Sequence, residues 1–179
     1  MKGVINKGIK EMIEAQHGID KWEEVRKNAG CEDIFFSVTE DYPDDLTIRL
    51  FQSAGEALSM SVEDLMMEFG KFWINETGRK TYPQIFQIAG KDARNFLRNM
   101  NRIHLQATQS IPDAAPPRFE YDDLPDGRLA MHYFGRKETI SMLKGLILGV
   151  GIYFNQDMEI EEKHGMRDGA SCTIMVRFK

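Results

Sequence analysis

The sequence contains little cysteine and no long uninterrupted run of apolar residues. Cys31 and Cys172 are its only cysteines and neither belongs to a Cys-x-x-Cys spacing, so neither a disulfide framework nor a cysteine zinc site is indicated. The longest apolar run, residues 145–154, is too short to span a bilayer, and charged residues interrupt the N-terminal segment. We therefore expect no membrane span, no signal peptide and a reducing, cytoplasmic setting.

Clustered positive charge and familiar catalytic motifs are also missing. The formal net charge is −5 over 179 residues, without a dense Lys/Arg run, which argues against a nucleic-acid partner because phosphates need clustered cations. The chain has no Walker loop, no Gly-x-Ser-x-Gly elbow and no His-Glu-x-x-His. We therefore expect a protein that is not an enzyme.

The composition that remains, 42% hydrophobic and 28% charged residues, suits one soluble domain over residues 1–179. The first two thirds of the chain have helical periodicity. Apolar spacing predicts a helix through Val4–Ile13 that ends near Gly18, and a second helix that ends near Gly30. A Ser61-x-x-Asp64 capping box predicts a third helix, which continues to Trp73.

The last third of the chain changes to a period of two, which is typical of strands. Residues 118–121 and 129–133 flank a Leu-Pro-Asp-Gly turn and predict a hairpin. A helix over 138–154 follows, and alternation on either side of residues 165–169 predicts a second hairpin. The fold class is therefore α+β, with an N-terminal helical part, an antiparallel sheet and one helix packed on that sheet.

A histidine lies in the apolar stripe of one strongly helical segment, Asn95–Thr108. Leu97, Met100 and His104 are separated by three and four residues, so we expect them on the same helix face. Prolines between Pro112 and Pro117 end the helix soon after the histidine. From the residues alone, His104 is either a core histidine bonded to carbonyls or a ligand.

Several motifs then occur together in one order. They are Met1-Lys2-Gly3, Phe69-Gly70-x-x-Trp73, Asn99-x-x-x-Ile103-His104-Leu105, Pro116-Pro117-Arg118-Phe119, Tyr133 and Gly145-Leu146-Ile147-x-Gly149. In this combination the chain resembles the H-NOX (heme nitric oxide/oxygen binding) family, which includes the sensor domain of soluble guanylate cyclase. The resemblance implies an H-NOX-like fold and a heme b cofactor (iron protoporphyrin IX). It also implies that His104 is the proximal iron ligand and that Pro117 presses on the porphyrin.

A five-coordinate heme needs a neutral imidazole, an apolar slot and groups that hold two propionates. From the sequence alone each apolar candidate for the slot is equally a core residue. The expected walls are Ile5, Ile9, Trp73, Leu97, Met100, Met142 and Leu146.

The residues expected at the propionates depart from the family pattern. The family has Tyr-x-Ser-x-Arg, whereas this chain has Tyr133-Phe134-Gly135-Arg136-Lys137. A lysine ammonium is a point charge and a glycine offers no hydroxyl, so we expect heme to be retained but lost more easily. Strand alternation should turn Arg136 away from Tyr133 and Lys137, unless a bulge at Gly135 changes the parity.

The gas ligand is inferred from the opposite side of the heme. Oxygen-binding members of the family use a tyrosine donor, and Met142 occupies that position here. An apolar pocket withholds the hydrogen bond that bound oxygen needs, so we expect a nitric oxide sensor that excludes oxygen and binds carbon monoxide weakly. The indole N–H of Trp73 could act as a donor if it turned inward.

The resemblance suggests that nitric oxide releases His104 from the iron, so that the heme relaxes against Pro117 and the helical and sheet parts shift. A chain of this length leaves no room for an output domain. We therefore expect a separate partner such as a histidine kinase or a cyclic dinucleotide enzyme.

Two other interpretations stay open. With Gly135 and Lys137 in the clamp, the domain could be a heme-poor protein-interaction module, or could bind another tetrapyrrole or hydrophobic ligand in the same slot. A heme peroxidase-like enzyme is the second interpretation, but the sequence shows no polar acid/base pair near the expected iron.

Overall fold

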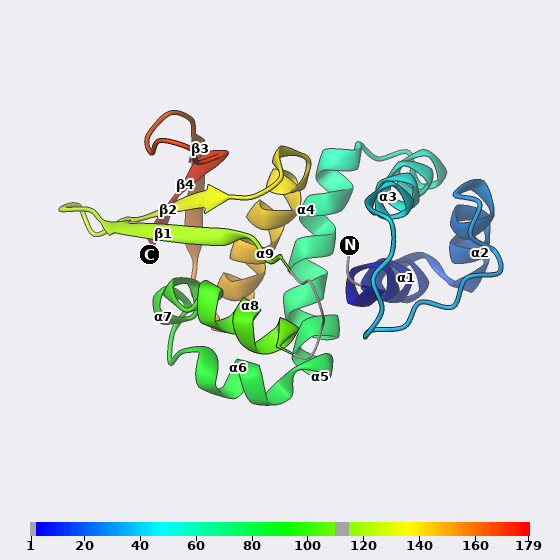
Figure 1. Ribbon diagram of the computed structural model, residues 1–179, viewed down its shortest axis with the longest axis horizontal. Coiled ribbons are helices and arrows are strands. Elements are labelled where there is room, and N and C mark those ends of the chain that lie inside the picture. Colours follow the sequence, from blue (N-terminus) through cyan, green and yellow to red (C-terminus); the bar gives the residue numbers. More distant parts are fainter. Residues whose placement is uncertain (1–2, 110–114) are drawn as a thin grey trace.

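The computed structural model describes residues 3–109 and 115–179. Met1, Lys2 and Pro112, on which part of the sequence interpretation rests, lie outside the described residues. Helices α1–α3 form one end of the molecule, the sheet forms the other, and α4 and α9 stand between them (Figure 1). None of the helices in the described ranges is long and apolar enough to cross a membrane.

The N-terminal part consists of α1 (Gly3–His17), α2 (Ile19–Asn28) and α3 (Asp44–Leu58). The two predicted helices are confirmed, and the first ends at Gly18, whose φ of 89° suits glycine. Helix α3 was not predicted. Its signal was present, because Leu46, Leu50 and Ala54 recur at helical spacing and are all buried.

The third predicted helix begins where the capping box placed it. In α4 (Val62–Phe72) the Ser61 hydroxyl accepts a hydrogen bond from the Asp64 amide at 3.0 Å. The helical structure does not end at Trp73, because a π-helix, η1 (Trp73–Gly78), follows α4 directly. Two helices that the sequence patterns did not predict come next: α5 (Arg79–Thr81) and α6 (Pro83–Ala89).

The prediction of one continuous helix over Asn95–Thr108 is wrong. The structure has α7 (Ala93–Arg98) and α8 (Met100–Thr108), which are separated at Asn99. The side-chain amide of Asn99 donates to the Ala89 carbonyl at 2.5 Å, and its backbone leaves helical geometry. The apolar stripe is therefore interrupted before it reaches the histidine.

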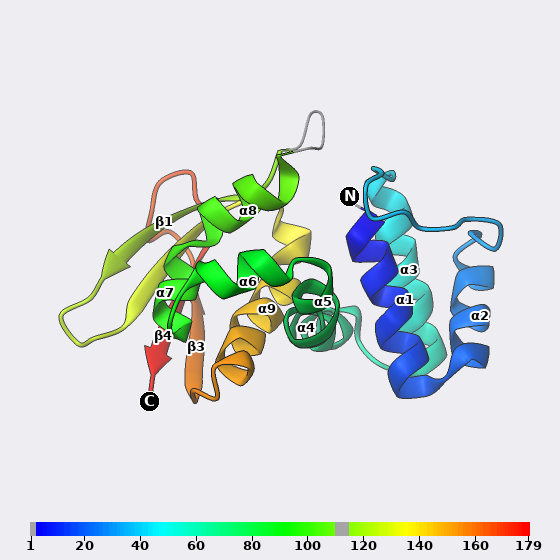
Figure 2. The same cartoon turned by 90° about the horizontal axis from the view of Figure 1, so that it is seen from below.

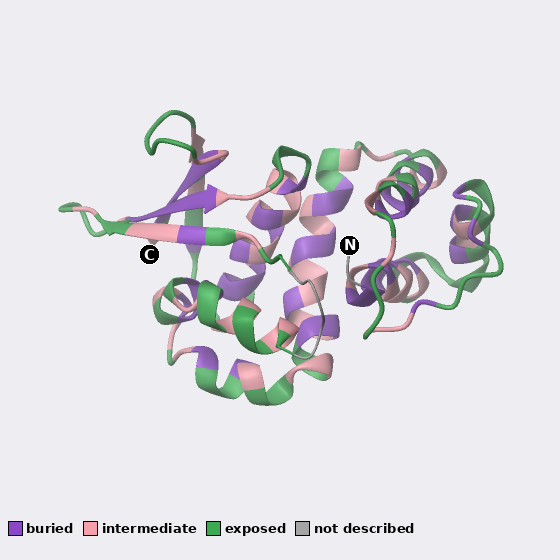
Figure 3. Cartoon of the chain, in the orientation of Figure 1, coloured by how far each residue is buried: buried purple, intermediate pink, exposed green. Residues whose placement is uncertain are grey.

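The sheet confirms both predicted hairpins and the α+β class. Its strands are β1 (Arg118–Asp123), β2 (Leu129–Phe134), β3 (Met158–Lys163) and β4 (Cys172–Phe178), paired antiparallel in the order β1-β2-β4-β3. The chain between the hairpins forms a short 3₁₀ turn, η2 (Lys137–Thr139), and then α9 (Ile140–Tyr153). Buried residues are concentrated in β2 and along the inner helices (Figure 3).

Helices α4 and α9 approach each other closely through glycine. A Cβ at Gly70 would lie 2.4 Å from the Leu146 amide nitrogen, and one at Gly145 would lie 2.1 Å from the Met67 carbonyl oxygen. Both distances are far below van der Waals contact, and the atoms concerned belong to backbone that cannot rotate away. The two helices therefore touch backbone to backbone.

Gly70→Ala should lower the free energy of unfolding by about 1–3 kcal/mol, because the added methyl group forces the two backbones apart. Gly8→Ala is the matched control, since the atoms nearest to a Cβ there belong to the Trp73 and Phe69 side chains, at 3.0 and 3.1 Å, and not to backbone. Urea unfolding of both variants measures the difference. An unchanged midpoint for Gly70→Ala would contradict the backbone contact.

Candidate cofactor site

A cavity of about 620 Å³ opens between the helical and sheet parts. Its walls come mainly from α1, α4, η1, α6, α8, α9 and the strands β1 and β2, with single residues from α3, α7 and η2, and most of the side chains are apolar. The volume falls within the range of about 300–1,000 Å³ that is usual for small-molecule and cofactor sites. Figure 2 shows α6 and α8 on one side of this region, with α1 and α3 across from them.

His104 lies on the cavity wall and projects from α8. Its ring stacks on Phe119 of β1, with centroids 5.9 Å apart and planes 29° apart. Nδ1 is buried and has no hydrogen-bond partner among the described residues. Burial lowers the pKa of His104 below its ordinary value of 6.5, although the Pro117 carbonyl opposes the shift. The imidazole is therefore neutral at pH 7, the form that binds metals.

Nine more of the predicted residues share this cavity with His104, and six of them are apolar. The apolar six are Ile5, Trp73, Met100, Pro117, Met142 and Leu146. Residues from helices α1, α8 and α9, distant in sequence, are thus brought to one apolar space.

Two of the expected walls lie elsewhere. Ile9 is fully buried in the core of the N-terminal helices. Leu97 borders a separate small gap against α9, because the break at Asn99 changes the direction of the chain between Leu97 and His104.

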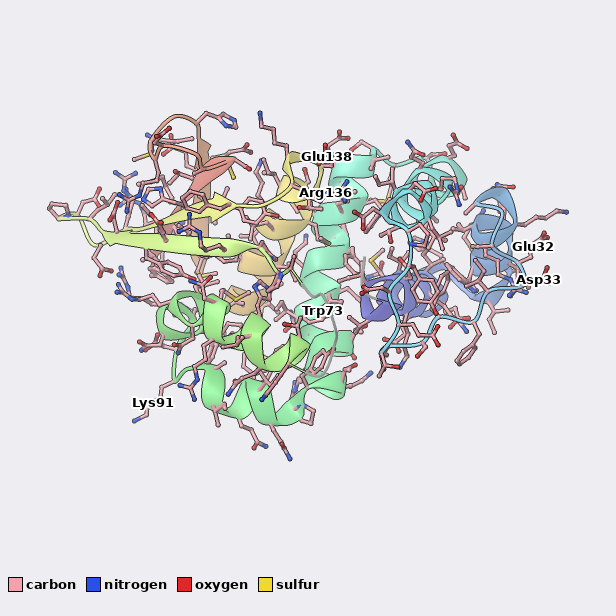
Figure 4. All side chains as sticks on the ribbon, viewed as in Figure 1. Glu32, Asp33, Trp73, Lys91, Arg136 and Glu138 are labelled. Atoms are coloured by element: carbon pink, nitrogen blue, oxygen red, sulfur yellow. The ribbon has the colours of Figure 1, made fainter. Side chains whose placement is uncertain are left out.

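The structure also corrects the expected arrangement of the two cations. Arg136 lines the cavity, whereas Lys137 is exposed and outside the lining. Strand β2 ends at Phe134, so strand alternation does not extend to Arg136. Gly135 and Tyr133 line the cavity as well. Figure 4 shows Arg136 at the top of the central helices, and its guanidinium forms an ion pair with Asp44 of α3.

Other polar and aromatic residues of the lining were not predicted, among them Asp44, Tyr82, Phe86 and Thr139. Pro83 at the first position of α6 is a helix-start signal that could have located Tyr82 and Phe86. Burial raises the pKa of Tyr82, so its hydroxyl keeps its proton. No sequence pattern identified Thr139 or Asp44, because tertiary contacts alone bring them to the cavity.

The Trp73 ring packs closely against two glycines. A Cβ at Gly78 would lie 2.4 Å from its six-membered ring, and one at Gly8 would lie 3.0 Å from Cδ1. The indole Nε1 is buried and has no hydrogen-bond partner among residues 3–109 and 115–179. The ring therefore forms part of the wall and packs closely against α1 and η1.

Residues 2–162 match the Haem-NO-binding (HNOB) family. The chain belongs to this family. It is 27% identical over 143 residues to soluble guanylate cyclase gcy-37 of Caenorhabditis elegans, a match that covers 78% of this chain and 20% of that protein. The chain thus spans about a fifth of that relative, and the matched part is its H-NOX sensor region.

Solved structures agree on the fold. An oxygen-binding H-NOX domain related to soluble guanylate cyclases, solved as its oxygen complex, superposes with a TM-score of 0.84 at 30% identity, covering 100% of this chain and 95% of that one. The H-NOX protein of S. oneidensis in the Fe(II)NO state gives a TM-score of 0.88 at 21% identity, with coverage of 100% and 99%. The fold is the H-NOX fold of heme-based gas sensor domains.

The residues of the cavity fit a heme. His104 offers a neutral imidazole whose buried Nδ1 lacks a partner among the described residues, the walls are mainly apolar, and Arg136 places a cation at one edge. These are the donor, the slot and the carboxylate partner that the group requires.

The burial of neutral His104 predicts how the stability of the apoprotein depends on pH. The folded chain resists protonation, so the unfolded chain binds the extra proton below about pH 6.5 and the free energy of unfolding falls as the pH drops further. In His104→Gln this slope should be shallower, by up to about 1.4 kcal/mol per pH unit. Urea unfolding between pH 7.5 and 5.5 measures both proteins, and parallel curves would contradict a desolvated His104.

Proposed function

We propose that the single domain 1–179 is a heme b sensor that binds nitric oxide, excludes oxygen and signals by release of His104. The observation that carries this proposal is the position of His104, a neutral imidazole on the wall of an apolar cavity, in a chain of the HNOB family. When bound, the heme supplies a ferrous iron that can take up a diatomic gas. The cavity walls decide which gas is held, and His104 couples its binding to the rest of the fold.

Exclusion of oxygen rests on Met142, which occupies the position of the family's tyrosine donor. Met142 lines the cavity and cannot donate a hydrogen bond, and the indole nitrogen of Trp73 is buried in the wall. Bound oxygen carries partial negative charge and depends on such a donor, whereas nitric oxide and carbon monoxide depend on it much less. Tyr82 also lines the cavity, and its hydroxyl is a donor that a Tyr82→Phe variant removes.

The signal has a physical route from His104 to the sheet. The Asn101 side chain of α8 donates to the Phe119 carbonyl at 2.8 Å and accepts from the Phe119 amide at 2.9 Å. Phe119 also stacks on the His104 ring. Release of His104 would remove one restraint on α8, and the paired hydrogen bonds would carry its displacement to β1.

The output of such a shift would be read by another protein. This partner is a cytoplasmic signalling protein such as a histidine kinase or a cyclic dinucleotide enzyme. Among the gases, carbon monoxide is a weaker ligand than nitric oxide. The α8–β1 route supports such a readout, because a displacement of α8 would reach the sheet part.

Absorption spectra of the reduced protein under argon, in air and with nitric oxide test the proposal. We expect one broad Soret band under argon, no change in air and a shift with nitric oxide. A stable complex in air would contradict oxygen exclusion, and Tyr82→Phe would then show whether the Tyr82 hydroxyl is responsible. Absence of any Soret band after hemin addition would favour the protein-interaction module instead.

Met142→Tyr is the matched gain-of-function variant. It places a hydroxyl donor on the cavity wall. The affinity for oxygen should therefore rise about tenfold, which is roughly the effect of one hydrogen bond. Met142→Phe adds similar bulk without the hydroxyl and should leave oxygen excluded. Equal behaviour of the two variants would mean that bulk, and not the donor, controls oxygen.

A further inference from the structure

We propose that this chain holds a heme propionate with a rearranged clamp, in which Arg136 binds the carboxylate while Tyr133 and Thr139 position Arg136, and that Asp44 competes with the propionate for Arg136. The inference rests on the proposed heme function. It replaces the expectation that Gly135 and Lys137 make up a weakened clamp. A phenol, an aliphatic hydroxyl and a guanidinium are all still present at the cavity, but the last two come from different positions in the sequence.

The glycine at position 135 permits this rearrangement. A Cβ at Gly135 would lie 2.3 Å from both the hydroxyl oxygen and Cζ of Tyr133, so no larger residue fits beneath the folded-back ring. The Ser171 amide donates to the Tyr133 carbonyl at 2.8 Å, and the Ser171 hydroxyl donates to the Gly135 carbonyl at 2.5 Å. The turn after β2 is therefore held firmly by the residue that leads into β4.

The Thr139 hydroxyl positions Arg136 and does not itself meet the propionate, because its proton is donated within the protein. The Oγ1 of Thr139 lies 2.8 Å from the Tyr133 hydroxyl, and it donates to the Arg136 carbonyl at 2.9 Å. Thr139 is 7% exposed and lines the cavity. One buried hydroxyl thus links the phenol to the backbone of Arg136 and fixes all three residues relative to one another.

Arg136 rather than Lys137 provides the cation. The 3₁₀ turn η2 begins at Lys137 and leaves the lysine exposed and outside the cavity, while Arg136 lines it. A guanidinium holds a carboxylate through two parallel hydrogen bonds, which a lysine ammonium cannot do. This geometry removes the reason to expect weak retention of the cofactor.

Asp44 supplies a carboxylate within the protein itself. It lies in the first turn of α3, lines the same cavity and forms an ion pair with Arg136. Glu138 adds a weaker contact, 3.8 Å from the Arg136 Nε. A propionate that binds Arg136 must compete with Asp44, and in doing so it loosens a link between the helical part and the sheet part.

The test is the rate at which the heme-loaded protein gives up heme to excess apomyoglobin, measured by absorbance. Arg136→Ala should speed the loss about tenfold, the effect of one charge-assisted bond. Lys137→Ala, its matched neighbour, should stay within about twofold. Thr139→Val should speed the loss by a smaller factor. Asp44→Asn should slow it about threefold, and Asp45→Asn, in the same helix turn but outside the cavity, should leave it unchanged.

A double variant separates competition from an indirect effect. In the Arg136→Ala background, Asp44→Asn should have no further effect, because the cation for which Asp44 competes is gone. Faster loss from Lys137→Ala than from Arg136→Ala would overturn the clamp, and slowing by Asp44→Asn in both backgrounds would overturn the competition. If the unmodified chain takes up no heme, the proposed function fails, and the clamp fails with it. Normal uptake with unaffected loss in Arg136→Ala overturns the clamp alone.

Discussion

Helices α4 and α9 cross so closely that neither Gly70 nor Gly145 has room for a methyl group. This contact joins the helical end of the molecule to the sheet, because α4 packs on the first helices and α9 leads into β3. It also determines which side chains reach the cavity, since α4 continues into Trp73 while α9 presents Met142 and Leu146. The shape of the pocket therefore depends on two glycines that do not line it.

The cavity combines three features that suit a cofactor with a metal and carboxylates. A mainly apolar space of about 620 Å³ contains a neutral histidine with a buried nitrogen that is unpartnered among the described residues, and an arginine that is paired with an aspartate of another helix. Burial of unpartnered polar atoms is unfavourable, so a group that binds the His104 nitrogen would relieve it, and Arg136 offers a cation to a carboxylate of the same group. A flat macrocycle with a metal at its centre and two carboxylates matches these features, because its metal would bind His104 and a carboxylate would bind Arg136.

Patterns of period 3.6 and period two predicted much of the fold, but tertiary contacts decided the rest. The capping box at Ser61 and both hairpins were readable, whereas the break at Asn99 depends on a hydrogen bond to the Ala89 carbonyl ten residues earlier. The same limit applies to the site. His104 could be found from its helix, but the exchange of Lys137 for Arg136 depends on where β2 ends, and Thr139 and Asp44 join through contacts between distant elements.

Every step of the proposed sensing depends on His104 holding the iron of a heme in this cavity, and the His104→Gly variant examines that bond. The substitution removes the imidazole and leaves space for a free one. We predict that the ferrous spectrum of the reduced variant changes, and that added imidazole restores the spectrum of the unmodified protein. A ferrous spectrum that is unchanged by the substitution, without imidazole, would assign the iron to another residue and contradict this role of His104.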